Sequence, residues 1–221
     1  MFAIITAALA PSVAFLSYYY LKQETHSRSF RKTARSFLIG MLLVFPIVTV
    51  QYALTEETGA SSSVFVQSFL YAGLFEEFFK WFILCAAVIP FIRVRSVYDT
   101  TLYALAVGLG FAAAENILYL TAYGVDIALG RALMPVASHA LFACTMGYYI
   151  GKASFLKGTA RKLFLFLALA VPFVLHGTYD LLLLIDRQYI VYFILPLGFL
   201  LWWTAAERLE AANRFEQMEG E

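Results

Sequence analysis

Charged residues are scarce in this sequence. Only 14% of its 221 residues are Asp, Glu, Lys or Arg, while 62% are hydrophobic and the mean hydropathy is +0.75. Soluble domains carry about 25% charged residues, so this composition excludes a water-soluble domain. The chain also lacks a basic domain that could hold nucleic acid, and we expect no nucleic-acid partner. The scarcity of charge indicates a protein that lies within a lipid bilayer.

Cysteine is scarce as well, with Cys85 and Cys144 as the whole complement. Both fall in apolar runs at different expected depths, which argues against a disulfide and for plain packing roles. The alternation typical of transmembrane β-strands is missing. We expect no cleavable signal peptide, because the first apolar run is followed by six more.

Long apolar runs make up most of the chain, and each is close to the roughly 20 residues that a helix needs to cross a bilayer. They predict an all-α fold, a polytopic bundle of about seven transmembrane helices. We expect one integral membrane domain over residues 1–206 and a short tail over 207–221. The expected spans are 2–21, 36–54, 64–90, 100–121, 132–151, 163–185 and 189–206.

Lys and Arg are distributed unevenly between the two sides of these spans. Thirteen of the sixteen lie in three alternate loops and in the tail, the opposite loops hold two, and one lies within a span. Basic residues favour the cytoplasmic side of a membrane, so the amino terminus is predicted outside and the carboxyl tail in the cytoplasm. The basic loops are 22–35, 91–99 and 152–162.

The third span holds three charged residues, Glu76, Glu77 and Lys80. A charge near the bilayer centre costs roughly 2.5–3.5 kcal/mol, so three together need an explanation. At about 100° per residue, all three share one face of a helix. A Glu–Lys pair could merely hold helices together, but it would leave the second carboxylate without a partner. We therefore interpret the stretch as functional.

Further buried polar residues follow in later spans. Glu115 and Asn116 end a run of small residues, which would let a neighbouring helix approach closely. His176 and Asp180 are four residues apart and so lie on one helical face, where the carboxylate can fix the tautomer of the ring. His139, taken alone, is more typical of a packing residue than of a base or a ligand.

Depth connects these residues. Counted inward from the expected outer helix ends at 1.5 Å per residue, Glu115, His139, His176 and Asp180 lie about 8–14 Å below the surface, and Glu76 lies at about 18 Å. Unrelated structural pairs would not need to agree in depth. We therefore predict one site, formed by four helices in the outer half of the membrane.

A dry pocket of carboxylates and histidines suits the activation of water. A carboxylate in a medium of low dielectric is a stronger base than in water, and His or Asn can donate to the oxyanion formed at an amide carbonyl. No cofactor is required for this chemistry. Zinc is an alternative, since His and Glu can bind it, although no His-Glu-x-x-His motif selects its ligands. A proton-coupled transporter also uses buried Glu, Asp and His, and a non-catalytic scaffold would need fewer carboxylates.

Three motifs carry a resemblance to a known family. The chain resembles the PrsW family of bacterial intramembrane proteases, which is related to the CAAX-processing and bacteriocin-processing membrane proteases. Glu76-Glu77-x-x-Lys80 is similar to the first superfamily motif, with Lys one position earlier than the usual Arg. Phe111-x-x-x-Glu115 is similar to the second, with Glu in place of His, and His176-x-x-x-Asp180 to the third.

The resemblance implies a multi-pass protease of the bacterial cell membrane. Its substrate would be a single-pass membrane anti-sigma factor, cut first on the extracytoplasmic side before other proteases complete its removal in a stress response. Depth and motifs together predict Glu76, Glu77, Glu115, His139, His176 and Asp180 as the catalytic residues, with Lys80 and Asn116 in support. Glu76 is expected to be the general base, His176 to stabilise the oxyanion and Asp180 to orient its ring. Any metal is left unassigned.

Overall fold

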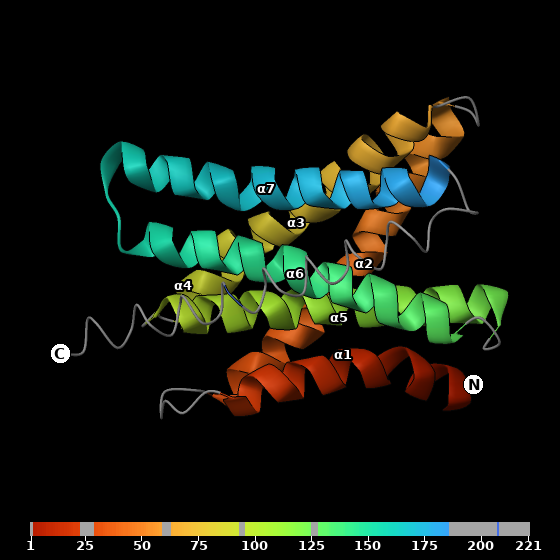
Figure 1. Ribbon diagram of the computed structural model, residues 1–221, viewed down its shortest axis with the longest axis horizontal. Coiled ribbons are helices and arrows are strands. Elements are labelled where there is room, and N and C mark those ends of the chain that lie inside the picture. Colours follow the sequence, from red (N-terminus) through yellow and green to blue (C-terminus); the bar gives the residue numbers. More distant parts are fainter. Residues whose placement is uncertain are drawn as a thin grey trace.

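Every regular element that the structure describes is a helix, which confirms the predicted all-α fold (Figure 1). The computed structural model describes residues 2–22, 29–58, 63–92, 96–124, 128–185 and 207. The predicted seventh span, 189–206, and most of the tail lie outside these residues. The elements are α1 Phe2–Lys22, α2 Phe30–Thr58, η1 Val66–Leu74, α3 Phe75–Ile83, η2 Leu84–Val88, α4 Ile89–Ile92, α5 Val97–Tyr123, α6 Ala128–Ser154 and α7 Gly158–Ile185.

Each of the first six predicted spans falls within a helical stretch. Four helices of the described chain are long and apolar enough to cross a membrane by themselves. These are Phe2–Leu21, Phe30–Glu57, Val97–Tyr123 and Gly158–Leu184. The total number of crossings and the sides on which the termini lie remain predictions.

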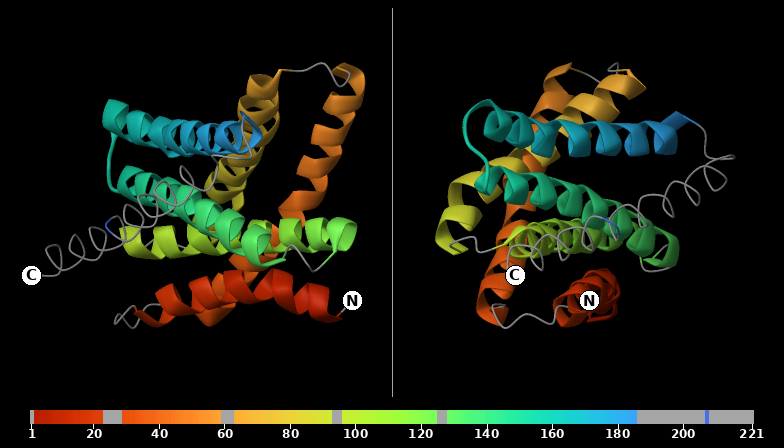
Figure 2. Two further views of the ribbon diagram at one scale, coloured as in Figure 1. Left: turned by 45° about the vertical axis from the view of Figure 1, so that its right-hand side comes forward. Right: turned by 60° about the vertical axis from the view of Figure 1, so that its left-hand side comes forward.

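Helix α5 is the centre of the bundle and lies between α1 and α6, with α2 crossing it (Figure 2). Glycines allow the backbones to approach. A Cβ atom on Gly110 of α5 would overlap the carbonyl of Phe37 on α2, and one on Gly108 would lie 2.5 Å from the Cβ of Ala143 on α6. Small residues at such crossings are the usual means of packing helices in lipid. The close packing brings Glu115 of α5 near α6.

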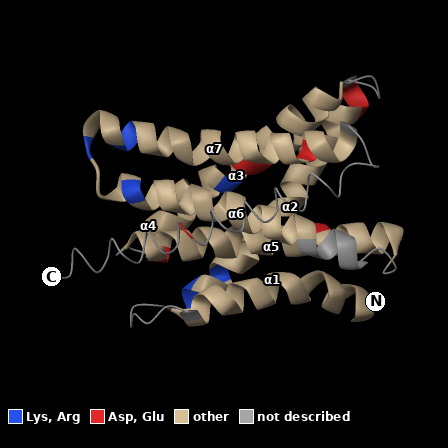
Figure 3. Ribbon diagram, in the orientation of Figure 1, with Lys and Arg blue, Asp and Glu red and all other residues tan. Residues whose placement is uncertain are grey.

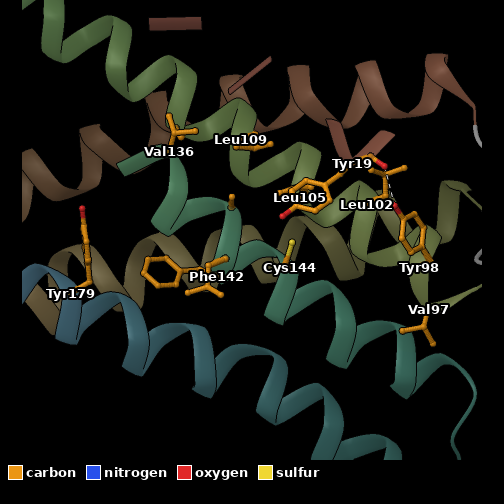
Figure 4. Packing of buried hydrophobic residues seen from close by; sticks show 13 residues of the cluster. Tyr19, Val97, Tyr98, Leu102, Leu105, Leu109, Val136, Phe142, Cys144 and Tyr179 are labelled. Carbon is orange, nitrogen blue, oxygen red and sulfur yellow. Dashed lines mark hydrogen bonds between the residues drawn. The ribbon is translucent and has the colours of Figure 1, made fainter. Parts of the chain in front are cut away.

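An apolar cluster joins α1, α5, α6 and α7 along the bundle (Figure 4). Leu105 and Phe142 are fully buried within it, at 0% and 1% exposure. The hydroxyl of Tyr98 at the start of α5 donates to the backbone carbonyl of Tyr19 on α1, at 2.9 Å, so its polar atom is satisfied in an apolar setting. This core fixes the helices that carry the polar site.

The third apolar run is a continuous helix with changing geometry. The π-helical segments η1 and η2 lie on either side of α3. π-helical turns are rare and occur frequently at functional sites. The α-helical stretch between them is the one that carries Glu76, Glu77 and Lys80.

Candidate active site

Helix α3 brings two carboxylates and an ammonium group together inside the protein. The Lys80 Nζ atom lies 2.9 Å from Glu77 Oε1 and 3.3 Å from Glu76 Oε2, and all three side chains are buried. It also lies 4.1 Å from the centre of the Phe111 ring. The single ammonium group offsets one of the two carboxylates, so the cluster needs further polar partners.

His176 of α7 supplies one such partner. Its Nδ1 atom lies 2.9 Å from Glu77 Oε1, while Nε2 lies 3.4 Å from Asp180 Oδ2 and 3.9 Å from Glu76 Oε2. Helix α7 can come this close to η1 because Gly177 has no Cβ atom. A Cβ at this position would overlap the Phe69 ring of η1. The ring is therefore oriented chiefly by Glu77, with the sequence-predicted partner Asp180 near its other nitrogen.

His139 of α6 supplies a second partner and links α3 to α5. Its Nδ1 atom lies 3.1 Å from Lys80 Nζ, and its Nε2 atom lies 2.9 Å from Glu115 Oε2. An ammonium group can only donate, so Nδ1 accepts and the ring proton sits on Nε2, where it donates to Glu115. The tautomer of His139 is thus fixed by residues of two other helices.

A cavity of about 730 Å³ opens in front of this cluster. Glu76, His139 and His176 line the cavity, whereas Glu77 and Lys80 are not in its lining. The side chain of Glu115 is 43% exposed and that of Glu77 is 0% exposed, so the cluster is accessible at Glu115 and fully buried at Glu77. The complete lining is Gln51, Gln67, Ser68, Ala72, Glu76, Glu115, Tyr119, Pro135, Ser138, His139, His176, Tyr179, Asp180, Leu183 and Leu184.

The cavity lies toward the helix ends that are remote from the basic loops. Its α5, α6 and α7 residues lie near the end of α5, the start of α6 and the end of α7. Lys and Arg instead gather where α6 joins α7 and at the start of α2 (Figure 3). The basic loops and the cavity therefore lie toward opposite ends of these helices.

Four groups of the cluster form a set that can hold a metal ion. One ligand atom from each of Glu76, Glu77, His139 and His176 lies within 4.8 Å of the others. The Glu77 Oε2 atom is buried and has no hydrogen-bond partner among the described residues. Two histidines and two carboxylates fit zinc in kind and number. Lys80, which contacts three of the four, would have to move aside.

The structure brings seven of the eight sequence-predicted residues together. Asn116 is the exception, because it is buried on α5 away from the cavity lining and its Nδ2 atom has no partner among the described residues. Gln51 of α2, which is not among the sequence-predicted residues, joins the cluster with its Nε2 atom 3.4 Å from Glu76 Oε1. The sequence feature that could have pointed to Gln51 is that it is an amide within the apolar run 36–54.

Known proteins resemble this chain over almost its whole length. The family described as "PrsW family intramembrane metalloprotease" matches residues 28–205. Protease PrsW of Bacillus subtilis (strain 168) is 45% identical over 219 residues, covering 99% of this chain and 100% of that protein. Protease PrsW of Geobacillus kaustophilus (strain HTA426) is 45% identical over 215 residues, or 97% of this chain and 94% of that protein. No solved structure gave a significant match.

Proposed function

Because the chain belongs to the PrsW family of intramembrane metalloproteases, and is therefore a multi-pass bacterial membrane peptidase, we propose that it makes the first cut in a single-pass membrane anti-sigma factor. The cut falls on the extracytoplasmic side and leads to release of the sigma factor. All the matches reported above are to proteases, so the transporter alternative is not proposed.

The observation that carries this proposal is the position of the polar cavity. It contacts Glu76, His139 and His176 and lies toward the helix ends opposite the basic loops. If the basic loops are cytoplasmic, the cavity faces the outer half of the bilayer. A substrate segment just outside or just within the outer leaflet could reach it, whereas a cytoplasmic segment could not.

Glu76 is the proposed general base. It is the member of the acidic pair that lines the cavity, while Lys80 contacts its Oε2 atom. A water beside it could be deprotonated as it attacks the peptide carbonyl. Glu77, sealed from the cavity, orients His176 through Nδ1, so that Nε2 remains directed toward the cavity side.

Glu77, His139 and His176 are the proposed metal-holding residues, which leaves Glu76 as the base. A zinc ion bound there would supply Lewis-acid chemistry to the scissile carbonyl. With zinc bound, His176 would act on the developing oxyanion through that ion; without zinc, direct stabilisation would require a protonated ring that donates from Nε2. Glu115 accepts the hydrogen bond from His139 Nε2 and is partly exposed at the cavity, where it can contact the substrate backbone.

The proposal is tested on the membrane proteins of cells that carry wild-type protein or Glu76→Gln. New amino termini are mapped by mass spectrometry after an envelope stress. An anti-sigma factor cut on its extracytoplasmic side in wild-type cells should remain full-length in Glu76→Gln cells. The same cut in both strains, or a cut on the cytoplasmic side, would overturn it.

A further inference from the structure

Gln51 is a polar side chain on α2 that reaches across to the third helical run. It is half-buried and forms part of the cavity wall. Its Nε2 atom donates to the backbone carbonyl of Tyr71 in η1 at 2.8 Å and, over a longer 3.4 Å, to Glu76 Oε1. One amide group thus contacts both the π-helical segment and the carboxylate of the site.

The chemistry of the two partners fixes the orientation of the amide. A backbone carbonyl and a carboxylate both accept hydrogen bonds, so the nitrogen of Gln51, which carries two hydrogens, must face them. Each hydrogen then has an acceptor. The bond to Tyr71 anchors the amide to η1, and this anchor places the second hydrogen toward Glu76.

Glu76 is consequently held from two sides. Lys80 contacts its Oε2 atom and Gln51 contacts its Oε1 atom. A neutral donor fixes the direction of a carboxylate without adding a second positive charge that would weaken it as a base. Elsewhere α2 contacts η1 sparsely, so no extensive packing between these two elements could substitute for the amide.

We propose that Gln51 is a positioning residue that sets the orientation of the Glu76 carboxylate toward the cavity. The inference rests on the proposed function for what Glu76 does. It adds a contribution from α2, a helix outside the three sequence motifs. Hydrogen-bond partners of metal ligands typically contribute about ten- to hundredfold to activity or metal affinity, and we expect an effect of the same size for the partner of a catalytic carboxylate.

The test compares purified wild-type protein with Gln51→Met, which keeps the length of the side chain and removes both donors. Thr49→Val is the control, because its exposed hydroxyl donates only to the Phe45 carbonyl of its own helix. Cleavage of a membrane-anchored peptide is measured in bilayers. We expect kcat to fall about ten- to hundredfold for Gln51→Met with KM within about twofold, and no change for the control. A rise in KM with unchanged kcat would overturn the proposal, because it would make Gln51 a substrate contact.

A double-mutant cycle with Glu76→Asp separates positioning from general stability. Glu76→Asp already displaces the carboxylate, so Gln51→Met should cost much less in that background than in wild type. Equal losses in both backgrounds would overturn the proposal. If Gln51→Met does not fold, Gln51→Asn, which keeps the amide but is one methylene shorter, replaces it with the same expectations. Normal cleavage by Glu76→Gln would instead defeat the proposed function and leave the Gln51 contacts to be judged separately by the cycle.

Discussion

The two ends of the bundle satisfy their polar side chains in different ways. Near the basic loops, at the start of α5, hydroxyl side chains pair with backbone atoms. Ser96 accepts from the Asp99 N–H at 2.9 Å, and Thr100 and Thr101 donate to carbonyls one turn earlier. Around the cavity, charged side chains from α3, α5, α6 and α7 pair with one another instead.

This difference distinguishes polar side chains that bond within their own helix from those that form the candidate site. A hydroxyl that bonds to a carbonyl of its own helix costs little free energy to bury and needs no partner on another helix. A network of carboxylates and imidazoles is stable only if several helices are placed together, and removing one member leaves a buried charge unpaired. Under the proposed function, the cavity end therefore carries the chemistry and the other end contributes packing.

The comparison depends first on which end is outside. Reporter fusions within 56–62 and within 152–162 should report an outer and a cytoplasmic location respectively, because basic loops stay in the cytoplasm. This is an all-or-none result. Reversed signals would place the cavity in the inner half of the membrane and remove the support for an extracytoplasmic cut.

The next largest effect is expected at the base. Glu76→Gln keeps the shape of the side chain but cannot accept a proton from water, so cleavage should fall by about 10²- to 10⁴-fold. Cleavage of a membrane-anchored peptide by folded, purified protein measures this. A normal rate would show that the base is another residue.

Packing at the crossing of α2 and α5 is expected to respond differently. Gly110→Ala would press a methyl group onto the Phe37 carbonyl and should destabilise the fold by about 1–3 kcal/mol or more. Thermal unfolding in detergent measures the loss, while the rate per folded molecule should change little. A large fall in that rate with normal stability would show that this packing position also affects the reaction.

The smallest effect is expected from Asp180→Asn. In the wild type the Asp180 carboxylate lies 3.4 Å from His176 Nε2. The amide of the variant can still contact this nitrogen, and Glu77 keeps its bond to Nδ1. We expect a loss of about tenfold or less, against about 10²- to 10⁴-fold for His176→Ala, because the latter removes the group itself. Equal losses for the two variants would give Asp180 a direct part in the reaction.

The sequence was sufficient to predict the described helices and to group most residues of the polar cluster, because hydropathy and the position of a residue along its helix can be read from each helix alone. Residues such as Glu115 and His139 could be grouped without knowing their contacts. Which atoms pair could not be predicted. Glu77 rather than Asp180 is nearest to His176, Gln51 joins from α2, and Asn116 is not in the cavity lining. These contacts depend on how each helix is rotated about its axis, which hydropathy does not specify.

The most direct test of the account measures metal content and cleavage on the same samples. Wild-type protein should retain about one zinc ion per chain, and its removal by a chelator should stop peptide cleavage until zinc is restored. His139→Ala and His176→Ala should lose both the ion and the activity. Metal-free wild-type protein that cleaves at the full rate would contradict a metal centre formed by Glu77, His139 and His176.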